Sequence, residues 1–376
     1  MFLTTTLISG CAGYLPGAGP DTKKVQELAT VPSTAIAVVS VDAQVNSKLQ
    51  QQFRQQQFAE IFAKTKTPHY QIGKGDVLEV SIWEAPPASL FGGAISETRN
   101  AMGGARATTL PDQMVSHQGN IRIPFVGAIS VLGKTQADIE WLITEKLKHK
   151  ANQPQVMVRV KNNNSSNVTV VGEVSSSRLI PLSSKGERLL DALALSGGVR
   201  QPVNKITVQL TREQQVASMP LADIIRDPRQ NVTLQTGDVV TALHAPLSLT
   251  VLGATGKNEE LNFEVQGISL VQALARAGGL QDNRADKQGV FLFRFEDANV
   301  ASVLGLTQTA NAEGKVPVVY RLDMSDPAVF FHAQNFRMQD KDVLYVSNAS
   351  AAELQKFLNV LLSAFYPLLN AVSVTR

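Results

Sequence analysis

Leu189-Leu190-Asp191-Ala192-Leu193-Ala194-Leu195-Ser196-Gly197-Gly198-Val199-Arg200 is one of two copies of a pattern that decides the fold of this chain. The second copy begins 81 residues later at Leu270 and ends at Gln281. Six of the twelve positions are identical: Leu189/Leu270, Ala192/Ala273, Leu193/Leu274, Ala194/Ala275, Gly197/Gly278 and Gly198/Gly279. Apolar residues at helical spacing before a double glycine predict a short helix that ends in a left-handed turn.

The repeat extends to both sides of this pattern. Val168-Thr169-Val170-Val171-Gly172 matches Leu249-Thr250-Val251-Leu252-Gly253 at the same shift, and strands are expected again at 206–210 and 290–293. Ser269 and Gln272 have the spacing of a capping box at the start of the second helix. We therefore predict two modules that mix strands and helices, at 162–247 and 248–348. Neither copy contains a catalytic pair, so a duplicated packing module without a ligand accounts for the pattern.

A different strand-forming segment precedes the repeats at Tyr70-Gln71-Ile72-Gly73-Lys74-Gly75-Asp76-Val77-Leu78-Glu79-Val80-Ser81-Ile82-Trp83. Its apolar and polar residues alternate after Asp76, which is typical of a half-buried strand. The glycines of this segment do not predict a phosphate-binding loop, because a third glycine, a Gly-Lys-Ser/Thr ending and a following helix are missing. Residues 85–117 are rich in Pro, Gly, Ala and Ser and predict a long surface insertion.

Regular structure is expected again after this insertion. A strand or edge segment is predicted at 121–127, and Thr135 and Asp138 have the spacing of a capping box. The helix that follows would have one apolar face, formed by Ile139, Leu142, Ile143 and Leu147. Val156, Val158 and Val160 alternate as a further strand. Residues 70–161 are therefore predicted to form an α+β domain.

Composition narrows the classes of function. The net charge of +3 is too small to indicate nucleic acid as the main partner. Five scattered His and a single Cys do not have the usual spacing of a zinc site, and one Cys excludes an intramolecular disulfide. The chain contains no run of 18 uninterrupted apolar residues, so a conventional transmembrane helix is not predicted. Neither a metal nor a cofactor is expected.

The single Cys, Cys11, follows an apolar stretch that ends in small residues, as in a secretory signal before its cleavage site. Ile8-Ser9-Gly10-Cys11 resembles the lipobox of bacterial lipoproteins, which implies that residues 1–11 are a signal and that Cys11 is lipidated with acyl chains such as palmitate. Ala12 then implies sorting to the outer membrane. A buried or incidental thiol is the alternative. Residues 12–69 predict a tether followed by a Gln-rich helical region, which packs on its own domain or contacts another chain.

Residues 349–376 predict an amphipathic helix. Lys356, Asn359, Ser363 and Asn370 share one polar stripe, and the remaining positions are mostly Leu, Phe, Val, Tyr and Ala. A helix over 350–374 would reach ~37 Å, enough for a hydrocarbon layer of ~30 Å. A polar stripe is costly in lipid unless it lines a water-filled lumen between several copies. A helix on the membrane surface and a helix docked on its own domain are the alternatives.

The motifs, in this order, resemble a family of bacterial polysaccharide export proteins. Three of them carry the resemblance in the first domain: Tyr70-x-Ile72-Gly73-x-Gly75-Asp76-Val77-Leu78, Gly119-x-Ile121-x-x-Pro124-x-x-Gly127 and Pro154-x-Val156-x-Val158. The two repeats are similar to the SLBB β-grasp domains that follow it in this family. The resemblance implies an α+β multidomain chain whose C-terminal amphipathic transmembrane helix forms an oligomeric α-helical barrel with other copies.

The resemblance also implies a function. The chain would be a ring-forming lipoprotein of the outer membrane, with its bulk in the periplasm, that exports capsule polysaccharide or exopolysaccharide and is not an enzyme. Expected partners are the polysaccharide, outer membrane lipid, other copies in a homo-oligomeric ring, and an inner-membrane polysaccharide co-polymerase or ABC-exporter adaptor. The four residues of the polar stripe would line the pore.

Two other classes of function compete with this reading. One is a periplasmic glycan-binding scaffold lipoprotein that forms no pore. The other is a polysaccharide-modifying enzyme, which would require paired carboxylates or a nucleophile with its base. Asp340 and Asp342 are the nearest carboxylate pair, but their surroundings repeat the turn-to-strand pattern of Gly75-Asp76 and Gly237-Asp238.

Overall fold

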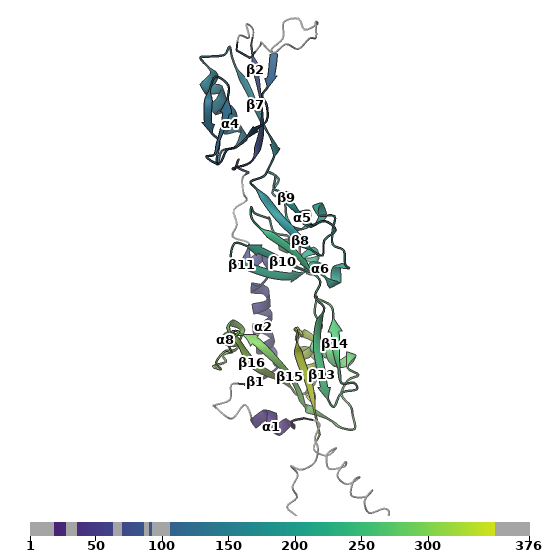
Figure 1. Cartoon of the computed structure of the whole chain (residues 1–376). Helices are drawn as coiled ribbons and strands as arrows, with labels where there is room; N and C mark the ends of the chain where they lie inside the picture. The colour runs from purple at the N-terminus through teal and green to yellow at the C-terminus, as the bar shows by residue number, and fades with distance from the viewer. Residues whose placement is uncertain (1–18, 28–35, 63–69, 86–89, 92–105, 350–376) are drawn as a thin grey trace, which may run out of the picture. The chain divides into compact units, whose positions relative to one another are not determined.

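A computed structural model describes residues 19–27, 36–62, 70–85, 90–91 and 106–349, as a series of mixed α/β domains (Figure 1). The chain divides into two compact units. One unit combines residues 1–55 with 246–376, and the other comprises residues 56–245. The second unit holds the 70–161 domain and the first repeat, whereas the first unit holds the second repeat together with the N-terminal segment.

The 70–161 domain is built around strand β2 (Val77–Glu84). β2 pairs antiparallel with β7 (Gln155–Asn162), β3 (Arg106–Thr109) and β4 (Gln113–Met114). Every second residue of β2 is buried, and these side chains share a core with the apolar face of α4 (Gln136–Leu147). A separate hairpin of β5 (Asn120–Ile123) and β6 (Gly127–Ser130) contributes to the same core. The predicted alternation of this strand is confirmed.

The start of α4 confirms the predicted capping box. The Thr135 hydroxyl accepts a hydrogen bond from the backbone N–H of Asp138 at 3.3 Å. In return, the Asp138 carboxylate accepts one from the backbone N–H of Thr135 at 3.0 Å. Because both backbone donors would otherwise be unpaired at the end of the helix, this reciprocal pair determines where α4 begins.

The expected surface insertion at 85–117 is wrong for its second half. Residues 106–109 and 113–114 are strands that pair with β2, and Leu110 and Val115 are buried in the core of the domain. Runs of two to four residues are too short to show an alternating pattern, and the Pro and Gly around them favour a loop. Pairing with β2 satisfies the backbone groups of these strands, which local sequence does not reveal.

The first repeat forms a five-stranded sheet in the order β11-β10-β12-β8-β9. β8 and β12 run parallel, whereas the other neighbouring strands run antiparallel. The strands are β8 (Asn167–Gly172), β9 (Arg178–Pro181), β10 (Thr207–Arg212), β11 (Gln215–Pro220) and β12 (Val239–Leu243). The helices are α5 (Leu189–Leu195), α6 (Leu221–Arg226) and the short 3-10 helices η1 (Val203–Lys205) and η2 (Pro228–Gln230).

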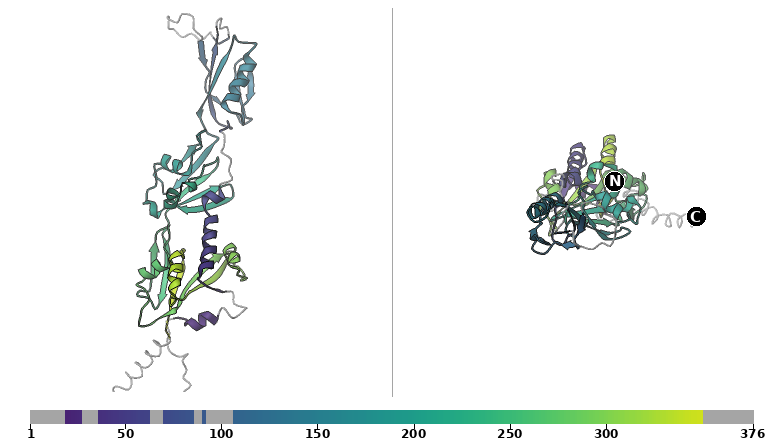
Figure 2. Two further views of the ribbon diagram at one scale, coloured as in Figure 1. Left: turned by 180° about the vertical axis from the view of Figure 1, so that it is seen from behind. Right: turned by 90° about the horizontal axis from the view of Figure 1, so that it is seen from above.

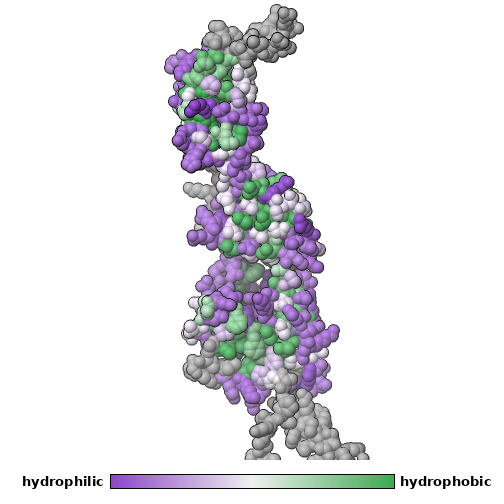
Figure 3. All heavy atoms as spheres, viewed as in Figure 1, coloured by the Kyte–Doolittle hydropathy of each residue, from purple (hydrophilic) through white to green (hydrophobic). Residues whose placement is uncertain are grey.

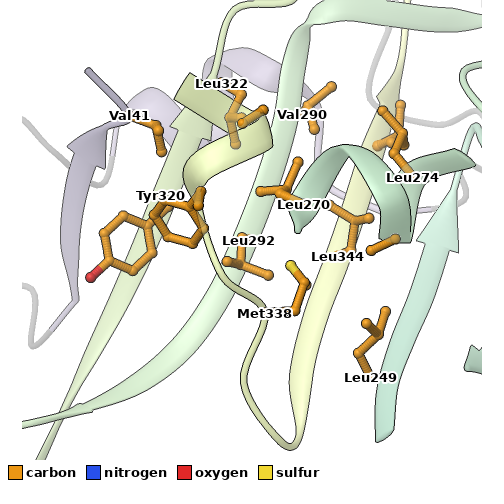
Figure 4. Packing of buried hydrophobic residues seen from close by; sticks show 14 of the residues in the cluster. Val41, Leu249, Leu270, Leu274, Val290, Leu292, Tyr320, Leu322, Met338 and Leu344 are labelled. Atoms are coloured by element: carbon orange, nitrogen blue, oxygen red, sulfur yellow. The ribbon is translucent and has the colours of Figure 1, made fainter. Parts of the chain in front are cut away.

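The second repeat has the same strand order, β16-β15-β17-β13-β14, which confirms the internal repeat. Its strands are β13 (Leu247–Gly253), β14 (Glu259–Phe263), β15 (Ala285–Asp297), β16 (Lys315–Leu322) and β17 (Asp342–Asn348). Its helices are α7 (Leu270–Arg276), α8 (Ala298–Leu304) and α9 (Pro327–Asn335). Figure 4 shows Leu270 and Leu274 of α7 above the buried side chains of the sheet, among them Leu249, Leu292 and Leu344.

The paired glycines end the two equivalent helices, as the sequence predicts. Gly197 and Gly198 have φ angles of 81° and 77°, and Gly278 and Gly279 have φ angles of 82° and 73°. Residues with a Cβ are disfavoured in this left-handed region, so two successive glycines allow the chain to reverse after a short helix. A Cβ at Gly278 would also lie 3.1 Å from the Cα of Gly256, which shows close backbone packing in the second repeat.

The N-terminal segment packs on the second repeat, far along the chain. β1 (Ala37–Ser40) pairs parallel with β16 and becomes the sixth strand of that sheet. Helix α2 (Ala43–Gln55) follows, and its Val45 and Leu49 pack against the same core. The left view of Figure 2 shows α2, in purple, beside the second repeat. The helix thus packs within its own chain, on the second repeat and not on a domain of its own, and the strand β1 is absent from the sequence-based prediction.

Two other parts of the N-terminal segment are also ordered. Helix α1 (Thr22–Glu27) lies within the predicted tether, but its Val25 is buried with Phe291, Val319 and Tyr345. The described part of that region is therefore not a free linker. Helix α3 (Phe58–Ile61) belongs to the other unit, where Phe58 and Phe62 enter the core of the first repeat.

All three domains contain the same turn before a strand. Asp76, Asp238 and Asp342 stand at the start of β2, β12 and β17, and each is at most 1% exposed. Each carboxylate accepts a hydrogen bond from the backbone N–H three residues earlier, at 2.7–2.9 Å. The residue just before each Asp has a positive φ, and it is Gly in the first two turns but Lys341 in the third, at 65°.

Replacing Lys341 with Gly should stabilise the second repeat. The change relieves the left-handed strain of a residue with a Cβ, partly offset by the greater freedom of Gly in the unfolded chain. We expect a net gain of roughly 0.5–1 kcal/mol, measured as a higher midpoint in thermal unfolding of the purified protein. Lys341→Ala is the matched control, because it removes the charged side chain and keeps the Cβ. An equal gain in both variants would show that the backbone strain is not the cause.

Candidate functional site

The site residues predicted from sequence lie outside the described part of the chain. This applies to Cys11 and to the polar stripe of Lys356, Asn359, Ser363 and Asn370. Within residues 19–349, as far as they are described, no helix is both long and apolar enough to cross a membrane. The same described residues contain no group of three or more His, Cys, Asp or Glu side chains that could hold a metal ion.

The buried aspartates of the two repeats are paired with arginines in the same geometry. Arg212 donates from Nε and Nη2 to the two oxygens of Asp238 at 2.9 and 2.6 Å. Arg294 donates from the same two atoms to Asp342 at 2.8 and 2.7 Å. Such two-point pairs are geometrically specific, and breaking a buried pair leaves an uncompensated charge. Sequence reasoning identified the aspartate turns but not their arginine partners.

Each arginine also connects the turn to the start of a helix. Nη2 of Arg212 donates to the carbonyl of Thr233, and Nη2 of Arg294 donates to that of Arg337, both at 2.9 Å. Thr233 and Arg337 in turn form β-bridges with Arg188 and Ser269, the residues that precede α5 and α7. The ion pairs therefore hold together the strand start, the sheet and the helix of each repeat.

In the second repeat, Glu296 and Tyr320 join this hydrogen-bond network. Glu296 accepts hydrogen bonds from Arg294 at 3.2 Å and from the Tyr320 hydroxyl at 2.8 Å. Burial, together with the neighbouring Glu296 carboxylate, raises the pKa of Tyr320 well above its usual value. Tyr320 thus stays protonated and acts as a donor. A group that holds its proton so firmly and is fully buried is suited to structure rather than to acid–base catalysis.

The carboxylate pair that an enzyme would need is engaged elsewhere. Asp342 is bound to Arg294, and Asp340 accepts a hydrogen bond from the backbone N–H of Ser248 at 3.0 Å. Among the described residues, no arginine pairs with the equivalent aspartate of the 70–161 domain. Asp76 instead accepts hydrogen bonds from Tyr70, from the backbone of Asn164, and from both the backbone and the hydroxyl of Ser165, at 2.8–3.1 Å. Burial and the Asp76 charge raise the pKa of Tyr70, so this phenol also remains a donor.

A hollow of about 270 Å³ opens on the 70–161 domain, where β2 ends and β7 begins. Its lining is Trp83, Glu84, Ala85, Gln153, Gln155 and Met157. Trp83 of β2 stands directly opposite Gln155 of β7 in the strand register. Figure 3 shows that the visible surface of this domain carries hydrophobic residues between hydrophilic ones. The hollow thus brings together the indole of Trp83, the thioether of Met157 and the side-chain amides of Gln153 and Gln155.

Glu84 holds the walls of this hollow. Its side chain is completely buried, and Oε2 accepts hydrogen bonds from the backbone N–H groups of Leu90 and Phe91 at 3.1 and 3.0 Å. Oε1 accepts one from the N–H of Asn152 at 3.0 Å. The carboxylate thereby ties two loops to the end of β2, and its oxygens are engaged in structure rather than offered to a ligand.

The hollow was missed by the sequence analysis, although one signal points to it. Trp83 continues the alternation of β2 in phase with Glu79 and Ser81, which places an indole among polar residues on the solvent side of the strand. A half-buried aromatic side chain in such a position offers an apolar ring face and a polar N–H to a ligand. The partners Gln153 and Gln155 lie about seventy residues later, so only the pairing of β2 with β7 brings them to Trp83.

Comparison with family profiles gives a match for each of the three domains. A family profile described as a polysaccharide biosynthesis/export protein matches residues 64–161. A profile described as an SLBB domain matches residues 166–241 and again 248–346.

Several relatives align with most of the chain. The capsule polysaccharide export outer membrane protein CtrA of Neisseria meningitidis is 42% identical over 370 residues, which cover 96% of this chain and 93% of that protein. The capsule polysaccharide export protein BexD of Haemophilus influenzae is 40% identical over 380 residues, with 98% and 95% covered. The Vi polysaccharide export protein VexA/TviF of Salmonella typhi is 30% identical over 297 residues, or 79% of each chain.

The profile matches follow the domains of the fold, and the two SLBB matches coincide with the two repeats of equal strand order. The 70–161 domain is the export domain of these profiles, and the two repeats are the SLBB domains. With profile matches over most of its length and relatives at 40–42% identity over nearly all of it, the chain belongs to the polysaccharide biosynthesis/export protein family.

Proposed function

We propose that this protein is an outer membrane channel that exports capsule polysaccharide or exopolysaccharide from the periplasm to the cell surface. The observation that carries this proposal is the alignment of nearly the whole chain with proteins named for capsule polysaccharide export. The chain itself contains an export domain followed by two SLBB domains. The protein acts as a conduit and not as an enzyme, and an inner-membrane co-polymerase or ABC-exporter adaptor supplies the energy.

The described chain begins and ends at neighbouring points of the second SLBB domain, which supports this function. The carbonyl of Pro20, nine residues after Cys11, accepts a hydrogen bond from the Tyr345 hydroxyl at 2.9 Å. The hydroxyls of Thr22 and Ser347 are 2.7 Å apart, and Ser347 stands nine residues before Lys356. Nine extended residues reach roughly 30 Å. An acylated Cys11 and a membrane helix at 350–376 can therefore enter the same membrane from one end of the second SLBB domain.

A ring of copies explains the composition of the C-terminal segment. A single helix with Lys356, Asn359, Ser363 and Asn370 on one stripe would expose polar groups to lipid, at a cost that several copies avoid by facing a common lumen. The stripe would then line the pore, and the apolar side would face lipid. Electron microscopy of the detergent-extracted protein would show such rings directly.

The export function can be tested by complementation. In a strain that lacks its own copy of this gene, the full chain should restore polysaccharide to the cell surface. Antibody labelling of intact cells measures the surface polysaccharide, and labelling after permeabilisation measures the total. A chain that ends at Ala349 should leave the polymer inside the envelope, because the membrane helix is missing. Immunoblots should show both proteins at equal abundance. Surface polysaccharide restored by the shortened chain would instead favour a periplasmic glycan-binding scaffold.

The anchor can be tested on the mature protein. We expect the mature N-terminal peptide to begin at Cys11 and to carry acyl chains, as measured by mass spectrometry. Each CH₂ of these chains that is buried in lipid adds about 0.8 kcal/mol of membrane binding. A Cys11→Ser variant should lack these chains and partition into the soluble fraction after the C-terminal helix is removed. A mature chain that begins at Met1 with an unmodified thiol would contradict the lipid anchor.

The pore lining can be tested by placing single thiols in the C-terminal helix. Asn359→Cys should react with a membrane-impermeant thiol reagent, whereas Leu358→Cys and Leu361→Cys should be shielded by lipid or by neighbouring helices. Cys11 is the only native Cys, so acylation leaves the new thiol as the only reactive one. Leu361→Lys should oppose insertion by ~3 kcal/mol near the centre of the bilayer. Equal labelling at every position from 354 to 372 would show that the helix is not in the membrane.

A further inference from the structure

We propose that the hollow around Trp83 in the export domain is a weak binding site for one pyranose ring of the polysaccharide. The identity of the polymer rests on the export function proposed above, whereas the site itself rests on the geometry of the hollow. Its occupant is a sugar ring bound by one apolar face and by its hydroxyl groups.

The size of the hollow fits one sugar ring. Pockets for drug-sized ligands usually measure roughly 300–1,000 Å³. At about 270 Å³ the hollow is below that range, yet it exceeds what single waters or ions require. The hollow is open to solvent and lies at the surface of a sheet. A sugar ring in the middle of a long polysaccharide can therefore enter it, without a free end of the polysaccharide.

The lining has the two kinds of surface that a pyranose presents. Carbon-bound hydrogens form the faces of the ring, and these pack well on an indole and a thioether, here those of Trp83 and Met157. Hydroxyl groups form its rim, and each needs both donors and acceptors. The amides of Gln153 and Gln155 supply both, and no described residue makes a hydrogen bond with either amide.

The site is held in place before a ligand arrives. Glu84 fixes the loop before β7 by accepting from the N–H of Asn152, and Asn152 makes two further hydrogen bonds with the backbone of Ala85, at 2.9 and 3.1 Å. Gln153 has a φ of 44°, which is uncommon for a residue with a Cβ, and it is followed by Pro154. Strain of this kind persists only where surrounding contacts enforce it, and it is concentrated at binding sites. A rigid lining lowers the entropy lost on binding.

The same geometry predicts weak affinity. The hollow is open, and its only carboxylate is occupied by backbone donors, so a ring gains few contacts and no ion pair. A dissociation constant on the order of millimolar follows for a single ring. Weak sites suit a conduit, because binding must favour entry and still permit release as the polymer moves on.

The chain provides its own reporter for this site. It contains only two Trp residues, Trp83 and Trp141, and Trp141 is 66% exposed on α4. In full-length protein with Trp141→Phe, all Trp fluorescence comes from Trp83. Titration with glucose and with N-acetylglucosamine should produce a saturable change in emission at millimolar concentrations. Sorbitol, a linear polyol with similar hydroxyl groups and no ring face, should produce none.

Variants separate a binding role from a structural one. In the Trp141→Phe protein, Gln155→Ala should weaken binding at least fivefold. Gln118→Ala is the matched control, because Gln118 is an exposed residue of the same domain that does not line the hollow. Trp83→Phe, which keeps Trp141 as the only indole, should abolish the response to sugar. Equal affinity in the Gln155→Ala and Gln118→Ala proteins would overturn the proposal.

Other outcomes also decide the question. A response to sorbitol equal to that to glucose, or no response to either sugar, would refute the sugar site. Emission that changes only when an oligomer dissociates would show that a second copy covers Trp83, which also refutes it. The proposed export function is refuted separately, by a full chain that does not restore surface polysaccharide. Normal export by a protein whose Trp83 does not respond to sugar would contradict this inference alone.

Discussion

A buried carboxylate at the start of a strand is the constraint on which each of the three domains depends. Asp76, Asp238 and Asp342 cannot be left unpaired, because an uncompensated buried charge costs several kcal/mol. Each closes its own turn through a backbone N–H three residues earlier and binds a second group from a distant segment: Ser165, Arg212 or Arg294. One side chain therefore sets where a strand begins and what that strand is attached to. In the SLBB domains the arginine extends this attachment to the start of a helix.

The second SLBB domain differs from the first in how its sheet ends. Strand β1 covers the edge of β16, which would otherwise offer unpaired backbone groups to other chains. Apart from β1, Pro20 and Thr22 lie against Tyr345 and Ser347, so the start and the end of the described chain meet in one domain. The edge strand thus has a structural role, because it covers the edge of the sheet.

Local patterns predicted those features that depend on neighbours in the chain. The alternation of Val77 to Trp83, the capping boxes at Thr135 and Ser269, and the glycine pairs after α5 and α7 were all recognisable, because their partners lie within a few residues. The internal repeat was visible because two copies of one fold keep the same spacing. Short strands such as β1, β3 and β4 were not recognised, since so few residues show little alternation and their hydrogen-bond partners are remote in the chain.

The site shows the same division. The sequence by itself determined that the chain is a series of α+β domains with a duplicated module, and it indicated Cys11 and the polar stripe after residue 349 as membrane elements, which stay predictions. Only the tertiary structure decided that Trp83 meets Gln155, that Arg294 is the partner of Asp342, and that β1 completes a sheet formed almost 300 residues later. The physical reason is that turns, caps and amphipathic faces are short-range, whereas a buried charge or a half-buried indole acquires its partner from whichever distant segment the sheet places beside it.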